Sequence, residues 1–264
     1  MTMSTTQHST TDNDLVRLEH VSKRFGPVEP LKDINLRVGH GEVLGLLGNN
    51  GAGKSTLMKI LCGFHPASDG TMYFEGKPVN LRSVTHARQL GIDCVYQDLA
   101  LVNELNVYHN MFLQREPVHG GPLGILNNKR MKADAERHLA DMGVNIPSVD
   151  VEIAKLSGGQ RQAIAVARSV YSNARLLLLD EPTAAMGAKE GAMILNVIKR
   201  LRERGDVSVI IIAHNYAQIF DVCDRINLLR EGEIVFDRAT SDTSVQELTD
   251  IVVNEYRAAT EAEA

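Results

Sequence analysis

The 264-residue sequence contains only three cysteines and has no surplus of positive charge. Cys62, Cys94 and Cys223 are odd in number and share no paired spacing, which excludes a disulfide framework and a cysteine-based metal knuckle. The pattern indicates free thiols in a reducing cytoplasm. The formal net charge of −5 at pH 7 argues against a protein that binds nucleic acid through a basic face.

Long apolar runs are also missing. The first fourteen residues, MTMSTTQHSTTDND, are polar and lack the apolar stretch of a signal peptide. No other run approaches the length of a membrane span. We therefore expect a protein that stays in the cytoplasm and does not cross a bilayer by itself. We also expect a domain over 14–256, flanked by disordered tails at 1–13 and 257–264.

Strand and helix patterns alternate along most of the chain. Short alternating segments in 15–47 predict edge strands that lead into a buried strand. Helical patterns within 98–172 predict an inserted helical subdomain, interrupted by a Gly/Pro/Asn-rich loop at 117–128. After it, apolar strands alternate with helical patterns at 188–204 and 215–222. This alternation predicts an α/β fold with a largely parallel sheet.

A glycine-rich stretch, GNNGAGKST, follows the buried strand and opens a helix. It matches the pattern G-x-x-x-x-G-K-[ST] at Gly48, Gly53, Lys54 and Ser55. Glycines at these positions let backbone N–H groups surround phosphates, the lysine reaches the β and γ oxygens, and the serine hydroxyl is a ligand for Mg²⁺. The stretch predicts a site for the phosphates of a nucleotide.

Two carboxylates end the apolar strand LLLLDE, at the strand end where ligands of an open α/β sheet collect. For Asp180 and Glu181 alone, a strand end that caps the next turn is an equal alternative. Beside a phosphate loop, Asp180 suits Mg²⁺ through water and Glu181 suits the attacking water. His214 ends another apolar strand, and on its own it is more typical of a helix cap or a packed residue than of a catalyst.

A second turn that can bind phosphate occurs at LSGGQ, residues 156–160. A Ser-Gly-Gly turn that opens an amphipathic helix presents free backbone N–H groups and the positive end of the helix dipole to an anion. One chain therefore has two phosphate-binding turns, which requires an explanation.

The stretches GNNGAGKST, VYQ, LSGGQ, LLLLDEP and IIIAH stand in the order of the motifs of ABC-type ATPases, and the chain resembles a nucleotide-binding subunit of that family. The resemblance implies that Gln97 contacts Mg²⁺ or its water, that His214 contacts the γ-phosphate and that Phe25 stacks on adenine. Without it, Phe25 is interpreted as a core residue.

The resemblance also implies ATP and Mg²⁺ as cofactors. The expected catalytic residues are Glu181, His214, Gln97 and Lys54. The expected metal-binding residues are Ser55, Gln97 and Asp180. The expected nucleotide-binding residues are Phe25, Asn49, Asn50, Gly51, Ala52, Gly53, Lys54, Ser55, Thr56, Ser157, Gly158, Gly159 and Gln160.

The family's fold and assembly account for the two phosphate turns. The resemblance implies a P-loop ABC cassette with a mainly parallel sheet core, an N-terminal antiparallel β-subdomain and an inserted α-helical subdomain. In this family the signature turn, LSGGQ, binds the γ-phosphate of an ATP held by the other subunit. We therefore expect an ATP-dependent head-to-tail homodimer in which each ATP lies between two chains.

One stretch departs from the family pattern. After DEPT the family usually has a segment that ends in Asp, whereas AAMG places Gly187 at that position. The segment crosses the dimer interface near the attacking water, so communication between subunits is expected to differ. An AALG-like variant is typical of single-chain importer ATPases for monosaccharides, which makes Gly187 a trait of that subfamily.

The resemblance leaves four kinds of ABC protein open. An importer ATPase is favoured because no membrane span is fused to the cassette and because NMFLQREP is similar to the FLGREP stretch of ribose-, xylose- and fructose-type importers. An exporter ATPase and a non-transport ABC ATPase are the alternatives. Glu181 and His214 argue against a module that only holds ATP.

The importer interpretation implies a sugar as cargo and a set of partners. These are a second copy of the chain, a multi-span membrane permease and, indirectly, a periplasmic sugar-binding protein, with no nucleic acid. The expected location is the cytoplasmic face of the inner membrane, as a peripheral subunit.

Overall fold

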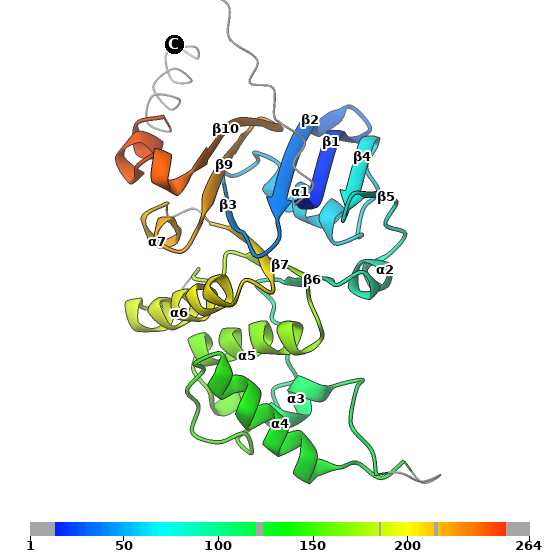
Figure 1. The fold of residues 1–264 in the computed structure, drawn as a ribbon, viewed down its shortest axis with the longest axis vertical. Helices are drawn as coiled ribbons and strands as arrows, with labels where there is room; N and C mark the ends of the chain where they lie inside the picture. The colour runs from blue at the N-terminus through cyan, green and yellow to red at the C-terminus, as the bar shows by residue number, and fades with distance from the viewer. Residues whose placement is uncertain (1–13, 120–123, 185, 214–215, 252–264) are drawn as a thin grey trace, which may run out of the picture.

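A computed structural model describes residues 14–119, 124–184, 186–213 and 216–251 (Figure 1). The tails expected at 1–13 and 257–264 lie outside the described residues. Within the described ranges, none of the helices combines the length and the apolar character needed to span a bilayer.

The larger sheet has six strands in the order β10-β9-β3-β8-β7-β6. All neighbours run parallel except β9 and β10, which pair antiparallel. Both β3 and β8 are buried along their whole length, which explains their continuous apolar sequences. The predicted mainly parallel sheet is confirmed. Its strands are β3 (Val43–Leu47), β6 (Ile92–Val95), β7 (Leu176–Asp180), β8 (Ser208–Ile212), β9 (Arg225–Arg230) and β10 (Glu233–Ala239).

The smaller sheet has the order β2-β1-β4-β5 and is antiparallel throughout. In β2, Ile34, Leu36 and Val38 alternate with more exposed residues and are buried, as a sheet with one core face requires. The predicted antiparallel β-subdomain is confirmed. Its strands are β1 (Asp14–Phe25), β2 (Val28–Gly39), β4 (Asp69–Phe74) and β5 (Lys77–Val79).

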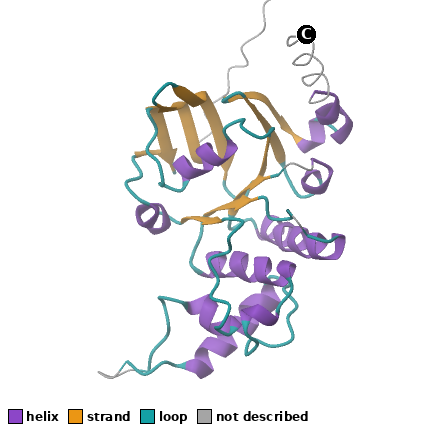
Figure 2. Cartoon of the chain, turned by 180° about the vertical axis from the view of Figure 1, so that it is seen from behind, coloured by secondary structure: helices purple, strands orange, loops and turns teal. Residues whose placement is uncertain are grey.

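Helices fall into two groups. Two helices lie between the larger and the smaller sheet along the chain, α1 (Lys54–Leu61) and α2 (Val84–Gln89), and two connect strands of the larger sheet, α6 (Ala188–Arg204) and α7 (Tyr216–Phe220). Those between β6 and β7 are α3 (Val107–Phe112), α4 (Asn128–Asp141) and α5 (Gly158–Tyr171). The second group packs around buried Phe112, Met131 and Ile164 and forms the lower part of the molecule in Figures 1 and 2. The predicted bounds 98–172 of an inserted subdomain stay a prediction.

A buried arginine joins the two sheets. The side chain of Arg225, on β9, is 9% exposed. Its Nε donates to Glu42 Oε1 at 2.6 Å and its Nη1 donates to Asp237 Oδ1 at 2.7 Å. Its Nη2 also donates to the carbonyl of Arg37 on β2. The guanidinium thus connects β9, β10 and the smaller sheet at one point, where water has little access.

Candidate functional site

The loop between β3 and α1 is held closely against neighbouring backbone. Gly53 has φ 109°, and a Cβ there would lie 2.4 Å from the carbonyl oxygen of Pro30. Gly48 has φ 153°, and a Cβ there would lie 2.3 Å from the carbonyl oxygen of Leu229. Only glycine tolerates both the dihedral angle and the contact. The predicted phosphate loop is therefore fixed in place by β2 and β9.

Lys54 begins α1 and is 6% exposed. Its Nζ donates to the carbonyl oxygens of Gly48 at 2.6 Å and Asn49 at 2.9 Å. Burial lowers the pKa of Lys54, and the negative charges of Glu181 and Asp180 act in the opposite direction. The lysine and the two carboxylates therefore belong to one electrostatic site. A phosphate oxygen can replace the two carbonyls that hold the ammonium group.

The other predicted residues of this loop differ in exposure. Ala52 is buried, and its N–H donates to the carbonyl of Asn49 at 3.2 Å, so its side chain faces away from solvent. Asn50, Gly51 and Ser55 are exposed, and Thr56 is half-buried. The loop therefore offers polar groups on its solvent side.

Parallel strand pairing brings the remaining predicted residues to one edge of the larger sheet. In register, Val95 pairs with Leu179 and Asp180 pairs with Ile212. Gln97 is exposed just past β6, and Asp180 is the last residue of β7. The carboxyl ends of these strands meet at the edge where β3 enters the phosphate loop. His214, predicted at the end of β8, lies outside the described residues.

Glu181 has an uncommon backbone conformation. Its φ is 49°, in the left-handed region, and its N–H donates to the carbonyl of Ile212 at 2.9 Å. A non-glycine residue in this region stores strain, which is common where a side chain must be held in one position for function. The carbonyl of Glu181 also accepts from Ala184 at 3.0 Å, so the strand end closes a turn as well.

The donor set suits magnesium. The groups that would hold it are the Ser55 hydroxyl, the Asp180 carboxylate and the Gln97 amide oxygen, and all three are hard oxygen ligands. In the part of the chain that is described, no three His, Cys, Asp or Glu side chains form a metal cluster. Mg²⁺ commonly uses one or two carboxylates together with phosphate oxygens, so the residues present fit this ion.

Phe25, the last residue of β1, is 44% exposed, so the interpretation of this residue as core is wrong. The Nζ of Lys23 lies 4.9 Å from the centre of its ring and donates to the carbonyl of Pro66 at 2.7 Å. His65 meets the ring edge-on, with centroids 5.2 Å apart. The ring is therefore held by two neighbours that sequence reasoning missed, while much of its surface is left open for stacking.

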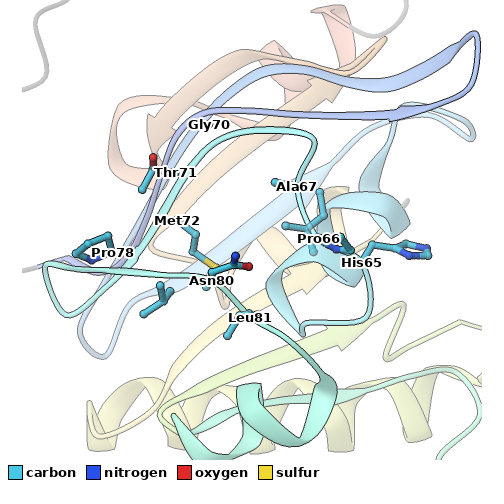
Figure 3. A pocket seen from close by; sticks show the side chains of 11 residues that line it. His65, Pro66, Ala67, Gly70, Thr71, Met72, Pro78, Asn80 and Leu81 are labelled. Atoms are coloured by element: carbon cyan, nitrogen blue, oxygen red, sulfur yellow. The ribbon is translucent and has the colours of Figure 1, made fainter.

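A cleft of about 380 Å³ begins at His65 and extends between the segment after α1 and the strands β4 and β5 (Figure 3). Met72, Asn80 and Leu81 contribute to its wall. None of the predicted nucleotide-binding residues lines this cleft, but His65 belongs both to its wall and to the contact with the Phe25 ring.

The signature turn forms a regular helix start. Ser157 is the N-cap of α5, and its Oγ accepts from the N–H of Gln160 at 3.3 Å. The Gln160 Oε1 accepts from the N–H of Ser157 at 3.1 Å, which completes a capping box. Figure 1 shows α1 in the upper part of the molecule and α5 in the lower part. The two turns predicted to bind phosphate therefore belong to different regions of one chain.

Known proteins are similar to this chain in sequence and in fold. A family model described as ABC transporter matches residues 31–184. A xylose/arabinose import ATP-binding protein of Sulfolobus acidocaldarius is 42% identical over 242 residues, which cover 92% of this chain and 95% of that protein. A ribose import ATP-binding protein of Hahella chejuensis is 39% identical over 241 residues, and the match covers 91% of this chain and 47% of that protein.

The fold is shared with a solved dimeric, post-hydrolysis ATP-binding cassette bound to ADP and Pi. The TM-score is 0.69 at 24% identity, and the match covers 85% of this chain and 98% of the other. With a family match over more than half of the sequence and a full-length relative above 40% identity, the chain belongs to the ABC transporter family.

Proposed function

We propose that this chain hydrolyses ATP to power the import of a sugar, in particular a monosaccharide. The observation that carries the proposal is the buried Lys54, held in the phosphate loop beside Asp180 and Glu181 at the edge of the sheet. Support for the cargo comes from the relatives, which are import ATP-binding proteins for xylose/arabinose and for ribose. The chain spans nearly all of the first relative but about half of the second.

Each of the site residues has a separate role in the proposed reaction. The phosphate loop binds the nucleotide through backbone N–H groups, and Lys54 moves from the loop carbonyls to the β and γ oxygens. Glu181 orients the attacking water and accepts its proton. Mg²⁺, when bound, neutralises charge on the β and γ oxygens. Gln97 and His214 complete the proposed set around the γ-phosphate.

The proposed assembly has two chains and two nucleotides. Because the phosphate loop and the signature turn lie in different regions of one chain, the γ-phosphate would be bound by Ser157, Gly158 and Gly159 of a second copy. The solved cassette with this fold was captured as a dimer. The other proposed partners are a membrane permease, which would hold the chain at the cytoplasmic face, and a periplasmic sugar-binding protein.

Sugar uptake by the source cells tests this proposal. Cells without the chain should lose the uptake of at least one radiolabelled sugar among xylose, arabinose and ribose. The wild-type chain should restore it, whereas Lys54→Ala should not, because the phosphate loop loses the ammonium group that reaches the γ-phosphate. Unchanged uptake of all three sugars would favour the exporter or the non-transport alternative.

Phe25→Ala should weaken ATP binding by roughly tenfold, because one stacked base contributes on the order of 1–3 kcal/mol. The fold should survive, since the ring is 44% exposed. Phe25→Tyr should bind ATP like the parent. Calorimetric titration with ATP measures the affinity, and thermal melting measures the stability.

Phe64→Ala is the matched control, because Phe64 is 59% exposed and also contacts His65 edge-on. Its ATP affinity should equal that of the parent. Lower stability of Phe25→Ala with an unchanged affinity would show that this ring contributes to packing only.

A further inference from the structure

Glu190, in the first turn of α6, places its carboxylate at the start of α5. Hydrogen bonding to the Ser157 hydroxyl, and to a smaller extent to the N–H groups of Gly159, Gly187 and Gly158, lowers the pKa of Glu190. Three of these groups belong to the signature turn, so an anion of the same chain already lies beside the turn.

The packing of the two helices confirms this contact independently. A Cβ on Gly158 would lie 3.9 Å from each carboxylate oxygen of Glu190. A Cβ on Gly159 would lie 2.9 Å from the Glu190 Cβ. Because Ser157 Oγ accepts from the Gln160 N–H, its own proton is free to point at the carboxylate. The start of α6 thus packs directly on the signature turn.

The γ-phosphate proposed for this turn needs the same donors. Phosphate and carboxylate are both acceptor-only anions, so they repel each other and cannot share one hydroxyl and two N–H groups. We infer that Glu190 occupies the γ-phosphate position of the signature turn in the open chain, and that the ATP of the partner chain must displace it before two chains close. This inference rests on the proposed function and adds a regulator to its site.

Gly187 allows this displacement. It is the N-cap of α6 and has no side chain to cap the helix, and its N–H is one of the groups whose hydrogen bonding lowers the pKa of Glu190. No atom lies within 4 Å of a Cβ built on Gly187. The carboxylate therefore has room to move toward Gly187 when it leaves the signature turn. The family's usual Asp at this position would fill that room.

Closure of the dimer tests the inference in a Glu181→Gln parent, in which slow hydrolysis preserves ATP. Light scattering after size exclusion measures the dimer fraction over a range of ATP concentrations. Glu190→Gln should lower the ATP concentration for half-maximal dimer roughly tenfold, because a neutral amide competes less well for the donors. Glu190→Ala should shift it in the same direction. ADP affinity should not change, since ADP has no γ-phosphate.

Glu203→Gln is the control, because Glu203 is exposed in the last turn of the same helix and its replacement removes the same charge. The dimer fraction of Glu203→Gln should depend on the ATP concentration as it does in the parent. A residue that only stabilised α5 would have the opposite effect, so an equal or higher ATP requirement in both Glu190 variants rejects the inference. If the parent itself binds ATP but never dimerises, the proposed sandwich fails and the inference fails with it.

Discussion

Glu181→Gln should reduce ATP hydrolysis by about 10²-fold or more while ATP binding is retained. Glutamine has the same size as glutamate and keeps the backbone N–H bond to Ile212, so the strand end stays in place. An amide, however, cannot accept a proton from the attacking water. Phosphate release measures the turnover, and calorimetric titration measures ATP affinity.

Glu75→Gln is a matched control for this experiment. Glu75 also has φ 49°, and it lies in the exposed turn between β4 and β5, where it pairs with Arg175. Exposed ion pairs contribute little, so this variant should hydrolyse ATP at the parent rate. If Glu181→Gln retained near-normal turnover, the general base would lie elsewhere, and His214 would be the next candidate.

Arg225→Met should lower the free energy of unfolding by about 3–5 kcal/mol, because it removes one partner from a buried ion network. Methionine fills similar space but leaves Glu42 and Asp237 without their ion pairs to the guanidinium. The melting temperature should fall by roughly 6–20 °C. Thermal melting and urea unfolding both measure this loss, without any need for ATP.

Two further variants separate charge from packing. Arg24→Met breaks the exposed Arg24–Glu29 pair and should change the melting temperature little. Adding Glu42→Gln and Asp237→Asn to Arg225→Met should recover part of the lost stability, because the buried negative charges are then gone. No recovery would show that the loss comes from packing around the methionine.

The sequence predicted those parts of the molecule that depend on local pattern. The glycine loop, the apolar strands and the helix over 188–204 all follow from residues close together in the chain, and the structure confirms them. Without the family resemblance, the sequence predicts a core position for Phe25. Its exposure depends on how the end of β1 lies against the segment after α1, which no local pattern describes.

The contacts missed by sequence analysis join residues that are distant in the chain. Lys23 and His65 meet at Phe25 only after β1 and the segment after α1 pack together. Glu190 reaches the signature turn only because α6 packs on α5. Each of these three residues is of a type that is common on protein surfaces, and no motif surrounds it in the sequence. The roles assigned to the site residues from the family motifs stay predictions.

The way α3, α4 and α5 are attached has a mechanical consequence. The chain leaves the edge strand β6 at Val95 and returns at Leu176 of its neighbour β7, at opposite ends of this parallel pair. At about 3.3 Å per residue, these points define a line along the strands. Arg168 of α5 donates to the carbonyls of Leu99 and Ala100, so a displacement of α5 would also pull on the segment that begins with Gln97.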